Sequence, residues 1–137
     1  MTELGEGLRD TLSTHGAQGS GILGVLEFTQ LSFVPARVFW IYGADKTVVR
    51  AKHWHKQDEQ YLVCLVGTLE VSRVGRQGET IVNLSAGSGV ALPTQTWIEL
   101  RNFSEGSVAL VLSSRPYDPN DCFSDYAEFE RVVIGKP

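Results

Sequence analysis

VVRAKHWHKQDEQYLVCLVG, residues 48–67, is the stretch that decides the fold, because it holds two of the three histidines and ends in the most apolar run of the chain. His53 and His55 stand two positions apart, so an extended strand places both rings on one face, about 7 Å apart along the chain. That spacing suits either a metal ion or a pair of groups that transfer protons.

The apolar run that ends this stretch predicts a strand covered on both sides. Both alternating sets of side chains are apolar, with Tyr61, Val63 and Leu65 in one set and Leu62, Cys64 and Val66 in the other. In a small barrel on its own, the outer face of such a strand is exposed to solvent. A second subunit, or its N-terminal strand, is therefore expected to cover this face. We therefore expect a homodimer.

Short β-rich segments separated by Gly, Ser and Asn turns continue on both sides of this stretch. The segments are 21–28, 36–42, 47–55, 68–74, 79–84, 90–93, 96–103 and 108–114. Many short strands with turn residues between them are typical of an all-β sandwich or barrel. Residues 1–20 lack a sustained period, so we expect a flexible N-terminal lead-in to a single domain over residues 21–137.

The chain changes period after Pro116. Phe123, Tyr126 and Phe129 fall at about helical spacing, and Asp121 precedes them as a candidate N-cap. The sequence therefore predicts one short C-terminal helix.

Composition limits the partners and the compartment. A chain of 137 residues suits one domain with one core, and a hydrophobic content of 42% is ordinary for a globular protein. A net charge of -4 offers no broad basic surface for nucleic acid or an anionic membrane. The N-terminus lacks the pattern of a secretory signal, and no apolar run is long enough to span a membrane. We expect a cytoplasmic protein with Cys64 and Cys122 as reduced thiols.

The spacing around the histidines matches the two-part cupin motif, a signature of small β-barrels that bind metals. His53-x-His55 is followed at the intervals of the motif by Gln60 and Gly67, and Gly87 by Pro93, Ile98 and Asn102. The metal ligands of the motif are the two histidines, a glutamate and a third histidine, and here Gln60 and Ile98 occupy the last two positions. Two imidazoles and a neutral amide make a poor site for a divalent ion, so we expect no metal and no other cofactor.

Without a metal, the histidine pair is interpreted as a general acid and a general base. Histidine titrates near neutrality, so one ring can accept a proton while its neighbour gives one. A close pair also separates the two pKa values, which favours that division of labour.

The chain from Gly21 onward resembles one family of cupins over nearly its whole length. The matching segments are GILGVLEF (21–28), RVFWIY (37–42), RAKHWHK (50–56), QYLVCLVG (60–67), Trp97, NFS (102–104), LSSRPYD (112–118) and YAEF (126–129). This family is the metal-free sugar-nucleotide 3,4-ketoisomerases of deoxysugar biosynthesis, which act on TDP-4-keto-6-deoxyhexoses. The resemblance implies a cupin barrel, also called a double-stranded β-helix or jelly roll, and a nucleotide-linked keto-deoxysugar as the substrate.

The resemblance also implies catalytic roles. In the relatives the paired histidines carry the acid and base chemistry, which implies these roles for His53 and His55. A tyrosine and an arginine upstream line the site, which implies Tyr42 and Arg50 as further catalytic residues. The implied reaction removes a proton from C3 of the 4-keto sugar, passes through an enediol and returns a proton to C4, so that the ketone moves to C3. Arg50, Tyr42 or Gln60 would hold the enolate oxygen or the diphosphate.

A further set of residues is expected to bind the substrate. The set is Gln60, Lys56, Trp97, Glu99 and Arg101. Trp97 suits stacking on a nucleotide base as well as packing in the core. Glu99 or Arg101 would supply the polar group that is missing where Ile98 replaces the third histidine.

Strand alternation makes two demands on the geometry of residues 48–55. Trp54 lies between the histidines and faces the opposite side, where it needs space. Alternation also puts Arg50 on the face opposite His53, so the role implied for Arg50 requires a bulge or a bend between them.

Two other functions stay open. A 3,5-epimerase acting on the same substrates also needs base-catalysed enolisation, and the absence of an aspartate partner for either histidine in the local motif weighs against it. A non-catalytic cupin that binds a sugar nucleotide is the second, and the changes at Trp54 and Ile98 keep it open.

Overall fold

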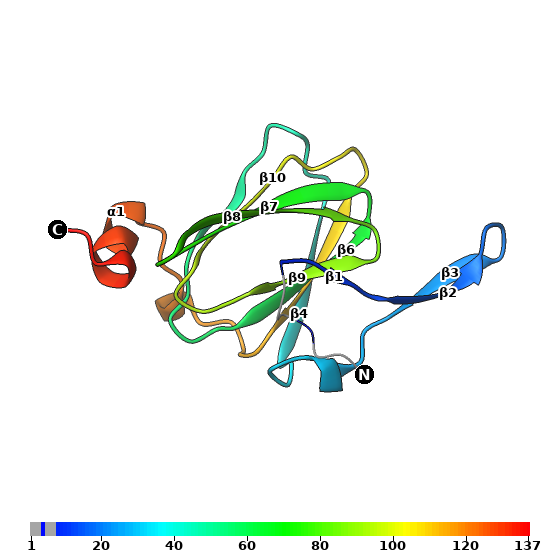
Figure 1. The fold of residues 1–137 in the computed structure, drawn as a ribbon, viewed down its shortest axis with the longest axis horizontal. Coiled ribbons are helices and arrows are strands. Elements are labelled where there is room, and N and C mark those ends of the chain that lie inside the picture. The colour runs from blue at the N-terminus through cyan, green and yellow to red at the C-terminus, as the bar shows by residue number, and fades with distance from the viewer. Residues whose placement is uncertain (1–3, 5–7) are drawn as a thin grey trace.

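Two antiparallel β-sheets enclose the main core of the protein (Figure 1). The structure, a computed structural model, describes Leu4 and residues 8–137. The five-stranded sheet has the order β1 (Asp10–Thr11), β9 (Ser88–Leu92), β6 (Gln60–Val66), β11 (Val108–Ser113) and β4 (Arg37–Tyr42). The four-stranded sheet has the order β5 (Arg50–His53), β10 (Trp97–Arg101), β7 (Thr68–Gly75) and β8 (Gly78–Ser85). The predicted all-β cupin barrel is confirmed.

Strand β6 lies in the middle of the five-stranded sheet and divides its apolar side chains between two clusters. Leu62 and Cys64 are fully buried in the main core. That core also takes residues from the facing sheet, among them Leu69, Val71, Val82, Leu84, Ile98 and Leu100. Tyr61 and Val63, on the other face of β6, belong to a separate cluster. Both faces of this part of the strand are therefore covered, as its double apolar pattern predicts.

The outer face of β6 is covered unevenly. Tyr61 and Val63 pack with residues that come mostly from the N-terminal part of the same chain, namely Leu4, Leu12, Leu26, Leu31 and Phe33. Beyond them, Leu65 is 46% exposed and Val66 is 51% exposed. The chain covers the first part of this face by itself and leaves the end open.

The structure differs from the sequence prediction at the N-terminus. Within the predicted lead-in, β1 pairs with β9, and β2 (Ser13–Ala17) pairs with β3 (Gly21–Val25) in a hairpin that projects from the body (Figure 1). The strand period is hidden there because β2 is polar and fully exposed. Gly19 in the turn of the hairpin and Gly21 at the start of β3 both have φ +90°, where glycine is favoured. The rest of the lead-in, residues 1–3 and 5–7, lies outside the described residues.

Strand β5 contains the bulge that the position of Arg50 requires. Along β10, Ile98 pairs with His53 and the next residue pairs with Ala51, so Lys52 is the extra residue. Ala51 and Lys52 have φ values of 68° and 55°, which are unusual for residues other than glycine. Arg50 is nevertheless exposed, whereas Ala51 packs against the main core and His53 is half-buried.

The C-terminal segment forms the predicted short helix, but from a different cap. Helix α1 (Tyr126–Phe129) continues as a π-helical turn, η3 (Glu130–Ile134), and the N-cap is Asp125, whose side chain accepts a hydrogen bond from the Glu128 amide at 3.2 Å. Asp121 instead ends a 3₁₀ turn, η2 (Pro119–Asp121), and its carboxylate binds another part of the chain. A further 3₁₀ turn, η1, spans Phe28–Gln30. Among the described residues, no helix is long and apolar enough to cross a membrane.

Trp54 joins the end of β5 to the C-terminal segment. Its backbone N–H donates to the Phe123 carbonyl at 2.9 Å, and the Phe123 N–H donates back at 3.0 Å. The indole is 1% exposed and stacks on the Phe123 ring with centroids 4.7 Å apart. The same cluster contains Trp97 and Phe129. As alternation predicts, Trp54 faces away from the histidines, and the space it needs lies beneath the C-terminal helix.

Replacing Trp54 with alanine is expected to lower the free energy of unfolding by about 3–5 kcal/mol, because it leaves a cavity among packed aromatic rings. Chemical denaturation measures this change. The control is Val132→Ala, since Val132 is 54% exposed in the same C-terminal segment and its truncation should change stability by less than about 0.5 kcal/mol. A loss below about 1 kcal/mol for Trp54→Ala would show that this cluster does not anchor the segment.

Candidate active site

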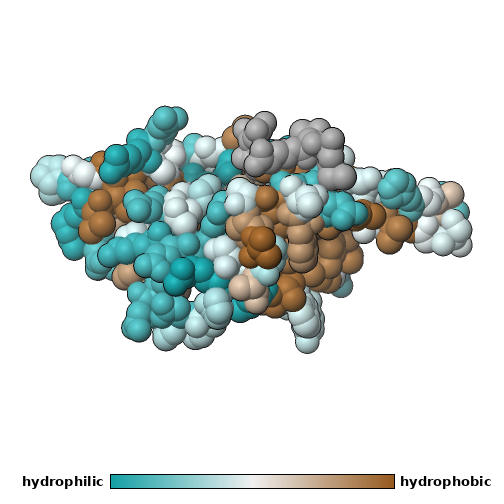
Figure 2. All heavy atoms as spheres, turned by 90° about the horizontal axis from the view of Figure 1, so that it is seen from below, coloured by the Kyte–Doolittle hydropathy of each residue, from teal (hydrophilic) through white to brown (hydrophobic). Residues whose placement is uncertain are grey.

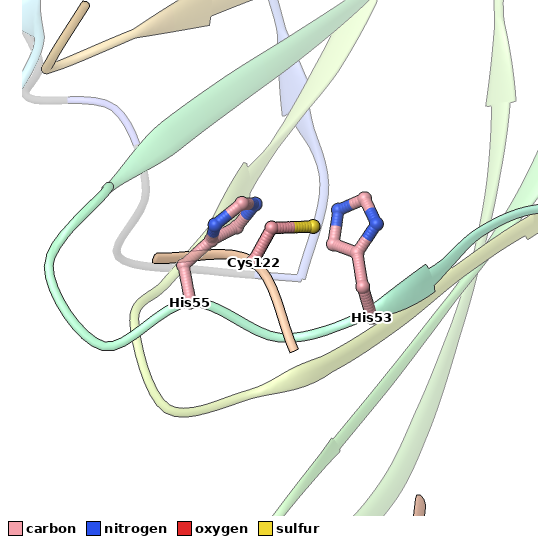
Figure 3. Close-up of side chains that lie close together, drawn as sticks. All are labelled: His53, His55 and Cys122. Atoms are coloured by element: carbon pink, nitrogen blue, oxygen red, sulfur yellow. The ribbon is translucent and has the colours of Figure 1, made fainter. Parts of the chain in front are cut away.

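His53 and His55 lie side by side next to a cavity of about 130 Å³. Strand β5 ends at His53 and the following loop carries His55; their ring centroids are 4.7 Å apart and the ring planes meet at 68°. Figure 3 shows both rings on one side of this segment, together with Cys122. The other walls consist of Arg37, Phe39, Asp58, Gln60, Arg115, Pro116, Tyr117, Asp118, Asp121 and Cys122. The cavity therefore joins β4, β6 and the C-terminal segment around the two imidazoles.

His53 is held without a charge. Burial of the ring is the main cause and the proximity of His55 the second, and together they lower the pKa of His53 from 6.5 to about 4. A hydrogen bond to the backbone of Ala51 and the charge of Asp58 oppose this shift but are weaker. At neutral pH, His53 therefore enters a reaction without its second proton, as a general base requires.

Asp121 fixes the position of the loop that carries His55. Its carboxylate accepts backbone hydrogen bonds from Lys56 at 2.9 Å, from Gln57 at 3.1 and 3.2 Å, and from Asp58 at 2.9 Å. Its backbone carbonyl lies 2.5 Å from Nδ1 of His55. A carbonyl only accepts, so Nδ1 carries the proton of the neutral ring and Nε2 carries the lone pair.

Asp58 is a buried carboxylate surrounded by donors. The Ser113 hydroxyl donates to it at 2.7 Å, the Gln60 amide at 2.9 Å and the Arg37 guanidinium at 3.5 Å. Hydrogen bonds to a charged acceptor are stronger than neutral ones, so this network fixes the amide of Gln60 and the guanidinium of Arg37 at the wall of the cavity. The charge of Asp58 is thereby held close to His53.

The structure brings some of the predicted site residues together and separates others. Gln60 lines the cavity. Arg50 is exposed and does not line the cavity. Tyr42 is 74% exposed on the outer face of β4. Lys56 lies beside the C-terminal segment instead, with Nζ 5.0 Å from the centre of the Phe123 ring.

The predicted binding residues of β10 lie on the wrong face for this cavity. Ile98 and Leu100 point into the main core, so Trp97, Glu99 and Arg101 point outward. Trp97 packs in the cluster beneath the C-terminal helix, and its indole N–H donates to Glu99 at 2.9 Å. Arg101 forms ion pairs with carboxylates of the same sheet, those of Glu70, Glu79 and Glu99.

Sequence reasoning missed much of the cavity wall. The guanidinium of Arg37 lies over the ring of Phe39 at 4.9 Å and that of Tyr117 at 5.7 Å. Alternation along β4 could have placed Arg37 and Phe39 on one face. In the structure this face is the half-buried one, and the residues between them are exposed. Asp121 and Cys122 gave no comparable signal, since they reach the histidines only through contacts between segments distant in the sequence.

Known proteins resemble this chain in both sequence and fold. A sequence profile described as "FdtA: WxcM-like, C-terminal" matches residues 10–134. The TDP-4-oxo-6-deoxy-alpha-D-glucose-3,4-oxoisomerase of Aneurinibacillus thermoaerophilus is 30% identical over 115 residues, which are 82% of this chain and 81% of that protein. A 3,4-ketoisomerase structure from Helicobacter canadensis is 28% identical, with a TM-score of 0.84 over 93% of this chain and 96% of that one. A mutant of the 3,4-ketoisomerase QdtA from Thermoanaerobacterium thermosaccharolyticum, in complex with TDP-4-keto-6-deoxyglucose, is 26% identical, with a TM-score of 0.85 over 93% and 94% of the two chains.

A pH titration of the histidine rings by NMR should show His53 uncharged down to pH about 5, because a lowered pKa delays protonation as the pH falls. The signal is assigned by its loss in His53→Asn. If the neutral ring is the base, kcat/KM should likewise persist below pH 6.5 and decline only as the pH approaches 4. A titration midpoint of His53 at 6.5 or above would contradict this picture of a buried, uncharged ring.

Proposed function

Since this chain belongs to the FdtA family of WxcM-like, C-terminal domains, we propose that it is an isomerase that moves the keto group of a TDP-4-keto-6-deoxyhexose from C4 to C3. The observation that carries this proposal is the pair of imidazoles in contact beside a cavity, one of them uncharged and the other oriented by Asp121. The relatives named above are 3,4-ketoisomerases or a 3,4-oxoisomerase, which supports the same reaction.

The proposed mechanism divides the proton transfers between the two rings. His53, uncharged, removes the proton from C3, and an enediol forms as negative charge develops on the C4 oxygen. As the general acid, His55 starts with protons on both nitrogens and gives the Nε2 proton to C4, since Nδ1 is directed at the Asp121 carbonyl. The hydroxyl proton of C3 passes to the C4 oxygen, so that C3 becomes the ketone and C4 carries the hydroxyl. Arg37 at the cavity wall is the cation that we assign to the developing charge on oxygen, because a fixed donor there stabilises the intermediate.

One contact keeps the 3,5-epimerase as the second candidate. The local histidine motif contains no aspartate partner, but Asp121 reaches His55 from 66 positions away through its carbonyl, and its carboxylate lies 3.9 Å from Nδ1. The absence of an aspartate from the local histidine motif is therefore a weaker argument against a 3,5-epimerase. Both reactions begin by removing a proton next to the ketone, so the label left in the product separates them.

Incubation with TDP-4-keto-6-deoxyglucose in deuterated water, followed by NMR, tests the proposal. We expect a 3-keto product with deuterium at C4. Deuterium at C3 and C5 with the ketone still at C4 would replace the isomerase by the epimerase. If the sugar nucleotide binds but takes up no deuterium, the non-catalytic binding protein is the function that remains.

Substitution of the two histidines tests the mechanism. His53→Asn and His55→Asn should each lower turnover by about a hundred-fold or more, because each removes one proton-transfer group. His15→Asn is the matched control, since His15 is the remaining histidine and is exposed on the projecting hairpin. Near-normal turnover in both site variants would remove the pair from the mechanism.

We also propose that the protein is a homodimer in which the hairpin of one subunit covers the outer face of the other. A two-stranded hairpin is marginally stable alone, and β2 and β3 pair only with each other in the described part of the chain. Beside the hairpin lies a broad hydrophobic area (Figure 2) and a groove of about 620 Å³ lined by residues of the hairpin and of β6, among them Ile22, Val63 and Leu65. Trp40, 58% exposed on the outer face of β4, extends the apolar surface.

Analytical ultracentrifugation checks this assembly. The wild-type protein is expected at the mass of two chains, and Ile22→Glu and Trp40→Glu are expected at the mass of one, because each puts a charge into an apolar interface. Val132→Glu, which changes an exposed apolar residue of the C-terminal segment, should stay dimeric. A monomeric wild-type protein, or dimers of both interface variants, would contradict the arrangement.

A further inference from the structure

Cys122 lies against the two histidines. His53, His55 and Cys122 each place one potential ligand atom within 4.8 Å of the other two, and they form the one group of this kind among the described residues. The Cys122 side chain extends from the C-terminal segment toward the space between the two imidazoles (Figure 3). Neighbouring ligand atoms of a tetrahedral zinc ion lie about 3.3–3.8 Å apart, so small rotations of the three side chains bring them into range.

The donor atom of His55 is prepared for a ligand. Nδ1 is directed at the Asp121 carbonyl at 2.5 Å, which leaves the lone pair on Nε2. Nε2 is buried and has no hydrogen-bond partner among the described residues. Metal-binding histidines regularly donate a hydrogen bond from their other ring nitrogen to a second group, which fixes the orientation of the imidazole. The orientation of His55 thus serves metal ligation as well as proton transfer.

The chemistry of the three donors selects the ion. Two imidazole nitrogens and one thiolate are typical ligands of zinc, whereas magnesium and calcium prefer oxygen. Three protein ligands leave the fourth position open toward the cavity. This set differs from the ligand set of the cupin motif, whose other two positions hold Gln60 and Ile98, because Cys122 enters from the C-terminal segment.

We propose that His53, His55 and Cys122 bind one Zn²⁺ ion, and that the bound ion stops proton transfer by occupying both imidazoles. The S–H bond of Cys122 breaks on binding, its electron pair stays on sulfur and is donated to the ion, and the proton leaves to solvent. The step needs no oxidant or reductant. The inhibitory part rests on the proposed isomerase function, whereas the binding part does not.

Cobalt substitution tests the binding part without any enzyme assay. Co²⁺ added to the metal-free protein should produce a thiolate-to-cobalt charge-transfer band and the intense visible bands of a four-coordinate ion. Zn²⁺ added afterwards should abolish both. A cobalt spectrum without the thiolate band would overturn the proposed ligand set.

Isothermal titration with Zn²⁺ should give one site per chain. Cys122→Ser should weaken binding by about a hundred-fold or more, because it removes one of three protein ligands while keeping the size of the side chain. Cys64→Ala, at the other cysteine, which is buried in the main core, is the matched control and should bind as the wild-type protein does. Circular dichroism verifies that each variant is folded. Equal affinity of folded Cys122→Ser and wild-type protein would refute the site.

The inhibitory part is measured as the ratio of isomerase activity with and without Zn²⁺ for each variant. The wild-type protein and Cys64→Ala should be inhibited at the zinc concentrations that fill the site, and Cys122→Ser should need about a hundred-fold more zinc. Zinc binding at the three residues without inhibition would overturn the switch and leave the metal site standing. If the isomerase assay itself fails, the cobalt spectrum and the calorimetry still decide the binding part.

Discussion

The carboxylate of Asp121 is the contact on which the geometry of the candidate site depends. It accepts the backbone N–H groups of three consecutive residues, 56–58, and its own carbonyl orients His55. Without Asp121 these amides would lose this acceptor, and the buried one, that of Asp58, would be left unpaired at a cost of about 1–3 kcal/mol. The loop therefore holds one conformation only when the C-terminal segment is in place. The backbone pairing of Trp54 with Phe123 keeps that segment there.

Two carboxylates serve the histidines in different ways. Asp58 lies inside a network of hydroxyl, amide and guanidinium donors, and its charge acts on His53 through space. Asp121 contacts His55 directly and sets which nitrogen faces the cavity. The two rings are in contact, yet their surroundings differ, and this asymmetry supports separate roles in a reaction that removes a proton at one carbon and returns it at the next.

The sequence predicts most of the strands and the histidine pair because both depend on local alternation. It also predicts the direction of Trp54 and the need for a bulge before His53, since both follow from counting faces along one strand. It fails where a role depends on contacts between distant segments: the sequence predicts Asp121 as the cap of the helix, whereas its carboxylate binds the loop of residues 56–58. The predicted binding residues of β10, Trp97, Glu99 and Arg101, do not line the cavity, because alternation along the strand directs them away from it.

The bulge at Lys52 interrupts the regular pairing of strand β5. At this point β5 has one residue more than the stretch of β10 that it pairs with. The extra residue comes directly before His53. The position of this ring therefore depends on the number of residues in the segment as well as on the identities of its side chains.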